Sequence, residues 1–414
     1  MANTVIIGSG LMGLSTAFYL SESPRSQAQN IHLVEASPEL FHCASGLGGG
    51  FLAEDWFVPS VAPLGALSFK LHKELADKYN GSEKWGYSRC TGTSLTRQTQ
   101  SKSKPGARGE DWIRYGGSRA AASGTIDEFV QGTDPAWLTK EAGNKLDVIS
   151  DEGTVAQVDP KRLCRFLLDT CLERGVKLYQ PAKVVQVDKD MRDQLSDVRI
   201  TMDNGDEVDV PCTRLVITAG AWSPSVFKQL FPNATMSIPI APLAGHSLLI
   251  KSPRWLKEHE KNGCHAVFAT DTQGFSPEIF SRVGEEIFLA GLNSSSIPLP
   301  DLPTDATTNS HDIEKLRSVA KQMLGMPDQE DDLQVLREGL CFRPVTESGT
   351  PIISRIEDSC LGDGFSTRGG GEGGVFVAGG HGPWGISQSI GTGKVLSELV
   401  EGMATSADIA ALAL

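Results

Sequence analysis

The sequence predicts an α/β fold at the two ends of the chain around an α+β middle, so one domain is expected to be discontinuous. Residues 4–8 are a β-branched run, followed by a helical apolar pattern and a second strand at 31–35, which together form a βαβ unit. Between about 235 and 300 the apolar runs are short, half-alternating and separated by turns, which is typical of antiparallel sheet. A strand at 375–379 and an amphipathic helix at 386–401 close the chain.

Two segments after the opening unit are expected to be loops. Residues 46–50 (GLGGG) predict a flexible loop. Residues 97–124 are poor in large apolar side chains and rich in Ser, Gly, Arg and Lys, which indicates an exposed insertion.

The middle of the chain begins with a helix that has clear start and stop signals. Asp159 is expected as its N-cap, Pro160 as its first helical residue and Gly175 as its left-handed stop. One apolar face is predicted to hold Cys164, Leu167, Leu168, Cys171 and Leu172, which places both cysteines in the core. The patterns that follow predict strands at 176–179, 184–187, 198–202 and 214–218, and a helix at 311–325.

The bulk composition excludes several classes of protein. The 414 residues carry a formal net charge of −13, which argues against nucleic acid, because phosphate binding needs clustered Lys and Arg. No apolar run approaches the length of a membrane helix, and neither a signal peptide nor a C-terminal peroxisomal address is visible, so a cytoplasmic protein is expected. The eight cysteines form no cluster with metal-ligand spacing, and no metal site is predicted.

The strongest motif is VIIGSGLMG, which places Gly8, Gly10 and Gly13 between a strand and a helix. The first glycine permits a tight turn, the second allows a pyrophosphate to approach, and the third lets helix and strand pack closely. The helix N-terminus offers N–H groups and a positive dipole end to the anion. Glu35 closes the second strand, where a ribose-binding carboxylate is expected and where a 2′-phosphate would be repelled. The motif itself fits FAD and NAD equally.

Several segments together resemble the D-amino-acid oxidase-like (DAO) flavoproteins, which include glycine and sarcosine oxidases. They are the fingerprint, GTVAQVDPKRLCRFLLDTCLERGVKLY (153–179), RLVITAGAWSPSVF (214–227), GLCFRPVTESGTPII (339–353) and VFVAGGHGPWGISQSIGTGKVLSEL (375–399). Residues 60–150 and 250–335 match only loosely. The resemblance rests on the order and spacing of these motifs.

The resemblance implies a Rossmann-like FAD-binding domain and an α+β substrate domain built on an antiparallel sheet. The FAD-binding domain is expected to combine residues 1–60, 151–232 and 336–414. The substrate domain is expected to combine 61–150 and 233–335.

The resemblance also implies which positions bind FAD. Gly8, Gly10, Gly13 and Glu35 would hold the ADP half, and Ser45 and Gly46 would lie along the pyrophosphate and flavin. Val184 would meet the adenine through its backbone, while Ala219 and Gly220 would line the inner edge of the flavin. The remaining cofactor positions implied are Leu11, Met12, Ala36, Trp222, Cys341, Arg343, Gly380, Gly382, Pro383, Trp384, Gly385 and Ile386.

The turn GHGPWG precedes the closing helix, so its N–H groups and the helix dipole can face the flavin edge where negative charge develops on reduction. Gly382 and Gly385 would act through their backbone. His381 is a candidate catalytic donor there, and a turn histidine satisfied by backbone is the alternative. His246, Arg282 and Trp384 could shape the pocket, although Trp384 could equally pack under the helix.

Arg343 falls where amino-acid-oxidizing members of the family bind the substrate carboxylate. A guanidinium presents a planar fork matched to a carboxylate, and a pocket beside an apolar ring system strengthens the pair. The alternative from the residues alone is an internal ion pair with one of the many Asp or Glu residues. On the substrate interpretation, the substrate carries a carboxylate next to an amine.

Cys341 occupies the position that carries FAD covalently in the sarcosine oxidase and fructosyl-amine oxidase branches. Strand periodicity points residues 341 and 343 toward the same face. The sarcosine-type branch lacks an arginine two residues later, and its oxygen-activating lysine is not evident after EIFLAG (286–291), where GLNSSS stands. A covalent flavin and a buried free thiol both remain open.

The expected activity is therefore FAD-dependent oxidation of the C–N bond of an amine or amino acid by hydride transfer to flavin N5, with O2 as acceptor. A flavin dehydrogenase with a different acceptor is one alternative. A non-catalytic FAD-binding interaction protein is another, and an NAD-linked dehydrogenase would rest on the fingerprint alone.

Overall fold

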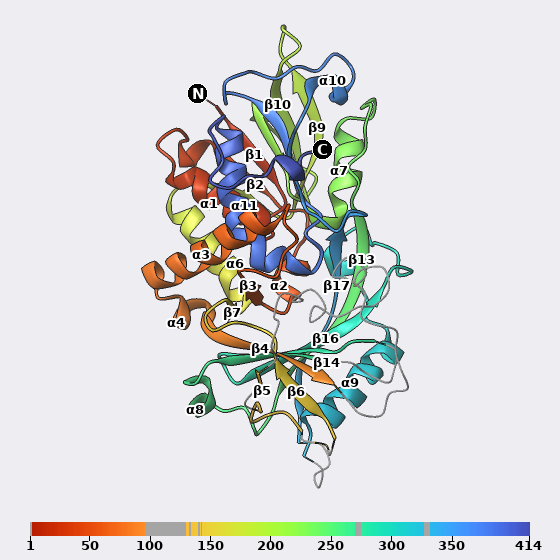
Figure 1. Ribbon diagram of the computed structural model, residues 1–414. Coiled ribbons are helices and arrows are strands. Elements are labelled where there is room, and N and C mark those ends of the chain that lie inside the picture. The colour runs from red at the N-terminus through yellow and green to blue at the C-terminus, as the bar shows by residue number, and fades with distance from the viewer. Residues whose placement is uncertain are drawn as a thin grey trace.

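The computed structural model describes residues 2–96, 130–131, 134–139, 141, 143–269, 275–326 and 332–414. The predicted insertion at 97–124 lies outside these described residues. The described elements form the mixed α/β arrangement that the sequence predicts, with helices around one sheet in the upper half of Figure 1 and a second large sheet in the lower half.

A six-stranded sheet forms the centre of the upper half. Its order is β18 (Ile352–Ile356), β19 (Gly374–Gly379), β12 (Arg214–Ile217), β1 (Thr4–Ile7), β2 (Ile31–Val34) and β8 (Lys177–Tyr179). All neighbours pair in parallel except β18 and β19. Strands β1, β2, β12 and β19 are buried along their whole length, because helices cover the sheet, and their continuous apolar runs are typical of such strands.

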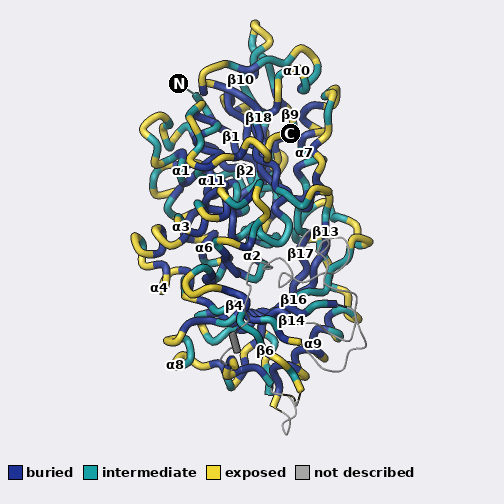
Figure 2. Tube along the Cα trace, viewed as in Figure 1, coloured by how far each residue is buried: buried dark blue, intermediate teal, exposed yellow. Residues whose placement is uncertain are grey.

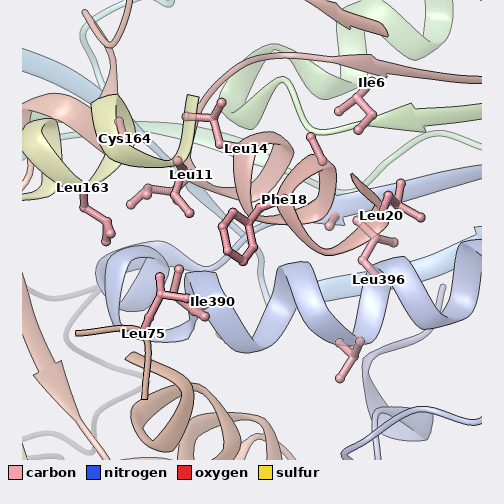
Figure 3. Packing of buried hydrophobic residues seen from close by; sticks show 14 of the residues in the cluster. Ile6, Leu11, Leu14, Phe18, Leu20, Leu75, Leu163, Cys164, Ile390 and Leu396 are labelled. Carbon is pink, nitrogen blue, oxygen red and sulfur yellow. The ribbon is translucent and has the colours of Figure 1, made fainter. Parts of the chain in front are cut away.

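The helices of this half pack mainly against α1 (Leu11–Glu22) and α11 (Gly385–Val400), which also pack against each other. Helix α1 packs against α6 (Pro160–Glu173), and α11 packs against α3 (Ala62–Tyr79). Figure 3 shows Phe18 of α1 lying between these helices, close to Ile390 of α11. The two ends of the chain are thus joined through a shared apolar core.

Helix α6 starts as the sequence predicts. The Asp159 carboxylate accepts hydrogen bonds from the backbone N–H groups of Lys161 and Arg162, and Gly175 has a positive φ of 100°. Cys164 and Cys171 are fully buried, which confirms their place in the core. Leu172 was expected on the same face, but it is 41 % exposed, because it lies in the last turn, beyond the elements that cover the helix.

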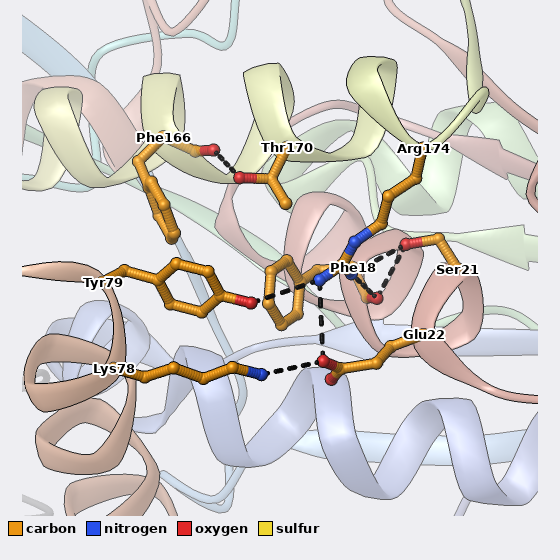
Figure 4. A network of polar contacts seen from close by, with 8 residues as sticks. All are labelled: Phe18, Ser21, Glu22, Lys78, Tyr79, Phe166, Thr170 and Arg174. Atoms are coloured by element: carbon orange, nitrogen blue, oxygen red, sulfur yellow. Dashed lines mark hydrogen bonds and ion pairs between the residues drawn. The ribbon is translucent and has the colours of Figure 1, made fainter.

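Arg174 ties the end of α6 to α1. Its guanidinium donates to the carbonyl of Phe18, to Ser21 Oγ and to the Tyr79 hydroxyl, and lies 3.6 Å from the Glu22 carboxylate. Figure 4 shows these contacts gathered at the end of α1, where they satisfy a helix-end carbonyl.

A three-stranded antiparallel sheet lies beside the first, in the order β11 (Glu207–Pro211), β10 (Leu195–Met202) and β9 (Ala182–Lys189). The sequence patterns predicted β9 and β10. Strand β11 was not predicted, because four of its five residues are exposed and its alternation is limited to Val208 and Val210.

The lower half is a large sheet whose main path is β17 (Gln334–Val345), β13 (Ala241–Lys251), β16 (Glu286–Ser294), β15 (Glu278–Arg282), β14 (Cys264–Ala269), β4 (Ser88–Thr96), β6 (Lys145–Val148) and β5 (Val130–Gln131). Strands β3 (Phe51–Ala53) and β7 (Val155–Gln157) pair with each other beside it. The pairs from β17 to β14 are antiparallel, as predicted, whereas β14 pairs with β4 in parallel. The long strands β13 and β17 extend toward the upper half (Figure 1).

The other described helical segments are α2 (Ala44–Leu47), α4 (Gly81–Trp85), α7 (Ser223–Leu230), α8 (Lys257–Glu260), α9 (Ser310–Leu324) and α10 (Asp358–Leu361), with short 3-10 turns η1 (Ala28–Asn30), η3 (Gly220–Trp222), η4 (Pro303–Asp305), η5 (Gly382–Trp384) and η6 (Ala410–Leu412). Figure 2 shows buried backbone running through both halves of the molecule.

The expectation of a loop at 46–50 is borne out for residues 48–50, which connect α2 to β3, but not for Gly46. Gly46 belongs to the short helix α2, and Gly48 to Gly50 lead directly into the buried strand β3. The glycines are needed for close packing: a Cβ on Gly46 would lie 2.1 Å from the Phe41 carbonyl oxygen, and one on Gly50 would lie 1.9 Å from that of Val158. Sequence composition alone does not distinguish a packed glycine run from a mobile one.

Candidate functional site

Two pockets lie on either side of the N-terminus of α1. One includes Gly8, just before this helix, and the other includes Leu11 and Met12, in its first turn. The empty space, adjoining solvent included, is about 1330 Å³ in the pocket with Gly8 and about 770 Å³ in the pocket with Leu11 and Met12. The first is called here the nucleoside pocket and the second the ring pocket.

The nucleoside pocket lies at the carboxyl ends of the parallel strands, where ligands bind in open α/β sheets. The predicted cofactor residues that line it are Gly8, Glu35, Ala36, Val184, Ala219 and Trp222. They come from β1, β2, β9 and the turn after β12, so the fold brings together positions that are far apart in the sequence.

The glycine-rich turn has the close packing that the fingerprint predicts. Gly8 has a φ of 99°, and a Cβ there would lie 2.7 Å from the Thr218 carbonyl oxygen. A Cβ on Gly13 would lie 2.0 Å from the Gly8 carbonyl oxygen, so only glycine lets α1 approach the turn. Gly10 faces Ser45, whose hydroxyl accepts the first N–H of the helix, from Leu11, at 3.0 Å. The turn is therefore fixed before any ligand enters.

The Glu35 carboxylate is held in place from two sides. One oxygen accepts hydrogen bonds from the backbone N–H and the hydroxyl of Ser9, at 2.9 and 2.8 Å, and the other accepts from the N–H of Ser37 at 2.9 Å. A carboxylate has about four acceptor positions, so capacity remains for a ligand hydroxyl. Its position in the pocket fits a ribose.

The ring pocket joins residues from six separate stretches of the chain. The predicted residues that line it are Leu11, Met12, Ser45, Cys341, Arg343, Gly382, Pro383, Gly385 and Ile386. The large sheet supplies a wall with Phe280 and Phe288, whose rings stack at 6.0 Å between centroids. Polar and apolar groups therefore meet in one cavity beside the helix N-terminus.

Arg343 lies on β17 and reaches into this pocket. Its Nη1 donates to Asn293 Oδ1 at 2.8 Å, which fixes the plane of the guanidinium. Gly245 lies beside the pair, and a Cβ there would be 3.0 Å from Asn293 Oδ1 and 3.5 Å from Arg343 Cζ. A side chain at Gly245 would thus crowd the Asn293 oxygen that accepts the Arg343 hydrogen bond.

Cys341 lines the same pocket as Arg343, as the strand period predicts. Its side chain is 8 % exposed. Burial raises the pKa of the thiol, and the nearby guanidinium groups of Arg343 and Arg337 oppose this shift. In this environment the neutral thiol is favoured over the thiolate.

Two histidines near the pocket each have one ring nitrogen engaged by another part of the fold. His246 lines the pocket, but its Nε2 accepts the backbone N–H of Asn309 at 3.1 Å. The His381 imidazole does not line the pocket, and its Nε2 lies 3.0 Å from Thr392 Oγ1 on α11. Burial lowers the pKa of His381 to about 3, so this ring is neutral at pH 7.

The Gly382–Trp384 turn places backbone rather than charge beside the ring pocket. Gly382, Pro383 and Gly385 line the cavity, at the start of the 16-residue helix α11. The Trp384 ring packs edge-on against Trp56 and Phe57, with centroids 6.3 and 5.0 Å away. This geometry matches the packing interpretation of Trp384.

Arg282 shapes the pocket from behind. It is 2 % exposed and donates to the carbonyl oxygens of Gly48 and Gly49, two residues that line the cavity. Gln157 Nε2 also donates to the Gly49 carbonyl, at 2.7 Å. Burial lowers the pKa of Arg282 to about 10, so its charge persists at neutral pH. We call Gly48–Gly50 and these two side chains the glycine clamp.

Some predicted positions lie outside the linings of both pockets. Gly10, Gly13, Gly46 and Gly380 occupy tight backbone approaches, and Gly220 has a φ of 56° in the turn after β12. Conversely, the linings include positions that were not predicted: Gly48, Gly49, Gly50, Phe51, Gly245, Ser247, Glu278, Phe280, Phe288, Ala290 and residues 299–303. Alternation along β15 and β16 could have suggested Glu278, Phe280, Phe288 and Ala290, because period-2 positions share a face. Residues 299–303 have no periodic signal.

Among the described residues, no group of His, Cys, Asp or Glu has a geometry that could hold a metal ion. In the same part of the chain, no helix combines the length and apolarity needed to cross a membrane.

Three features together define a dinucleotide-binding oxidoreductase site. They are the glycine-rich turn, the carboxylate at the end of the second strand and the ring pocket at the helix N-terminus. The family model for FAD-dependent oxidoreductases (DAO) matches residues 3–399, and the chain belongs to this family. The resemblance that the motifs indicate is thereby confirmed.

Among curated proteins, "Putative oxidoreductase C1F5.03c" of Schizosaccharomyces pombe is 27 % identical, covering 98 % of this chain and 96 % of that protein. The D-amino acid dehydrogenase of Allorhizobium ampelinum is 26 % identical over 48 % of this chain and 39 % of that protein. Among solved structures, glycine oxidase from Geobacillus kaustophilus superposes with a TM-score of 0.71 at 20 % identity, covering 100 % of this chain and 98 % of that one. Iminodiacetate oxidase from Chelativorans sp. BNC1 gives 0.70 at 16 %, with coverage of 99 % and 98 %. These structural matches show the shared fold.

FAD is the cofactor of this family, and the residues that line the two pockets suit its parts. The helix N-terminus and the closely packed glycines suit a pyrophosphate, with a nucleoside on one side and a flat ring system on the other. Glu35 is placed for a ribose hydroxyl, and the apolar wall of the ring pocket suits the isoalloxazine.

Proposed function

We propose that this protein oxidizes the C–N bond of an amine or amino acid that carries a carboxylate. The observation that carries the proposal is Arg343, which projects from β17 into the pocket assigned to the flavin ring. Its fixed guanidinium offers paired N–H donors to a carboxylate. The FAD-dependent oxidoreductase family supplies the redox chemistry of the site.

The residues of the chain would contribute binding and orientation. Arg343 would hold the substrate carboxylate, and Asn293 would keep the guanidinium in one plane. The apolar wall with Phe280 and Phe288 would lower the local dielectric constant and strengthen this ion pair. Bound FAD would accept the hydride from the carbon next to the substrate nitrogen.

His246 and His381 are unsuited to remove the amine proton. Asn309 already occupies the acceptor nitrogen of His246, while His381 faces Thr392 inside the fold. The amine would therefore enter in its neutral form, and the protein would act through position and electrostatics.

For the electron acceptor we propose O2, with a flavin dehydrogenase as the second candidate. The second is favoured by one observation: none of the described residues that line the ring pocket is a lysine. Asn293 stands after the EIFLAG strand, where the sarcosine-type branch was expected to show an oxygen-activating lysine.

The test is anaerobic mixing of the purified holoprotein with a panel of primary and secondary amino acids of both configurations. Bleaching of the visible flavin absorbance by a carboxylate-bearing compound, but not by its decarboxylated analogue, would support the proposal. Reoxidation by air at least as fast as by an artificial acceptor would support the oxidase assignment. A flavin that no member of the panel reduces would contradict the proposal and favour a non-catalytic FAD-binding protein.

A further inference from the structure

The nucleoside pocket has a wall that does not belong to the nucleotide-binding motifs. Besides the strand ends and Glu35, the cavity is lined by Leu299, Pro300, Asp301, Leu302 and Pro303. These residues follow β16 of the large sheet and precede α9, in a segment that matches the family motifs only loosely. A loop from one half of the molecule thus closes a pocket that the other half builds.

One hydrogen bond connects this loop to the turn after β12. The indole N–H of Trp222 donates to the carbonyl oxygen of Pro300 at 2.7 Å. The Trp222 ring also packs edge-on against Phe342 of β17, with centroids 6.2 Å apart. Trp222 therefore touches the pocket, the loop and the large sheet at once.

The loop itself is stiff and locally packed. Prolines stand at 298, 300 and 303, and each fixes the backbone φ, which reduces the entropy lost when the loop is held in place. Ile297 and Leu299 pack against a small apolar cluster that includes Leu340 and Phe342. The Asp305 carboxylate accepts the N–H of Leu302 at 3.2 Å, which orders the end of the loop.

We propose that residues 297–303 form a cover over the nucleoside half of FAD, latched by Trp222, so that the rate of cofactor release depends on this side chain. The proposal rests on the assignment of this pocket to the nucleoside of FAD. The charged residues of the lining are Glu35, Asp301 and Lys183, and Glu35 ends the second strand, where a ribose-binding carboxylate is expected.

The experiment measures FAD release from the holoprotein after rapid dilution, by the rise in fluorescence of free flavin. All variants carry Cys341→Ser, so that a thioether cannot retain the flavin. Trp222→Phe keeps an aromatic ring and removes the indole N–H, and Leu299→Ser weakens the packing of the cover independently. We expect each variant to release FAD roughly three- to tenfold faster, the size of effect given by one lost neutral hydrogen bond or a weakened apolar contact.

Trp255→Phe is the matched control. Its indole N–H also donates to a carbonyl, that of Arg282 at 2.8 Å, but Trp255 lines neither pocket. We expect its release rate to match that of the parent. If Trp222→Phe and Leu299→Ser release FAD at the same rate as the parent, the proposed role of the cover is wrong.

A further variant separates failure of the cover from failure of the site assignment. Glu35→Gln weakens the ribose contact without touching the loop. If Glu35→Gln speeds release and the two cover variants do not, the pocket assignment stands and the cover is wrong. If none of the three changes the rate, both are wrong. Thermal unfolding of each variant shows whether a faster release merely reflects loss of the fold.

Discussion

The guanidinium of Arg343 is the charge on which the proposed chemistry depends. The sequence alone allowed an internal ion pair or a substrate contact, and the structure shows a bond to Asn293 inside a cavity. A neutral acceptor therefore helps to orient the side chain, and a planar guanidinium is the kind of group that binds a carboxylate.

Arg343→Met is expected to raise the substrate concentration needed for half-maximal flavin reduction. The increase should be roughly 30- to 100-fold, because one charge-assisted, bidentate contact is lost. Arg343→Lys should lose less, because it keeps the charge but not the fork. Stopped-flow measurement of flavin reduction provides the values. Arg317→Met is the control, because Arg317 pairs with Glu338 at the surface, at 2.6 Å. An unchanged concentration dependence in Arg343→Met would refute the assigned role.

Cys341 lies where a covalent flavin bond is chemically accessible, but its environment opposes the thiolate. Burial raises the pKa of the thiol, and the thiolate is the nucleophile in bond formation. We therefore expect the yellow colour in the supernatant after acid precipitation, both in the parent and in Cys341→Ala. Colour in the parent pellet that disappears in Cys341→Ala would instead establish a thioether.

At the scale of elements, the strands with apolar runs and the capped helix α6 were predictable, because local pattern and tertiary burial agree there. The edge strand β11 was not, because most of it is exposed and only Val208 and Val210 alternate. The close packing of the glycines at 46 and 50 was not predictable either, because close approach to Phe41 and Val158 is a property of the packed fold. Residues 299–303 reach the nucleoside pocket through a loop, which no periodicity reveals.

The glycine clamp carries a prediction at this scale. Arg282→Met keeps the buried volume and removes the donors to the Gly48 and Gly49 carbonyls. Unfolding free energy is expected to fall by about 2 kcal/mol, the cost of buried carbonyls left without partners. The visible flavin spectrum should also shift, because the wall of the ring pocket moves. Urea titration and absorbance spectra measure the two effects. If the variant and the parent have identical visible spectra, Arg282 has only a structural role.

At the scale of the whole molecule, the buried cysteines together make the free energy of unfolding depend on pH. Among the described residues, eight cysteines are present as free thiols, most of them buried. Burial raises the pKa of Cys171 and that of Cys264 each to about 12, from an ordinary value of 9.0. Between these values the unfolded chain releases thiol protons that the native chain retains, so stability falls as pH rises.

The unfolding free energy should therefore change little through these thiols below pH 8 and decline above pH 9. Each such thiol contributes a loss of about 1.4 kcal/mol by pH 10. Urea unfolding at a series of pH values from 7 to 10 measures the slope. Cys264→Ala should have a shallower slope above pH 9, whatever its absolute stability. A slope equal to that of the parent would show that this thiol does not contribute.

The order of strands in the six-stranded sheet has a consequence for biosynthesis. Strand β1 pairs with β2, which follows it closely, and with β12, about 200 residues later, while the next strand of the sheet is β19. The ring pocket combines Leu11 and Met12 with Gly382 and Gly385, so its wall is complete only after the ribosome has made residue 385. A flavin can therefore be enclosed only after these distant segments have been synthesised and packed together.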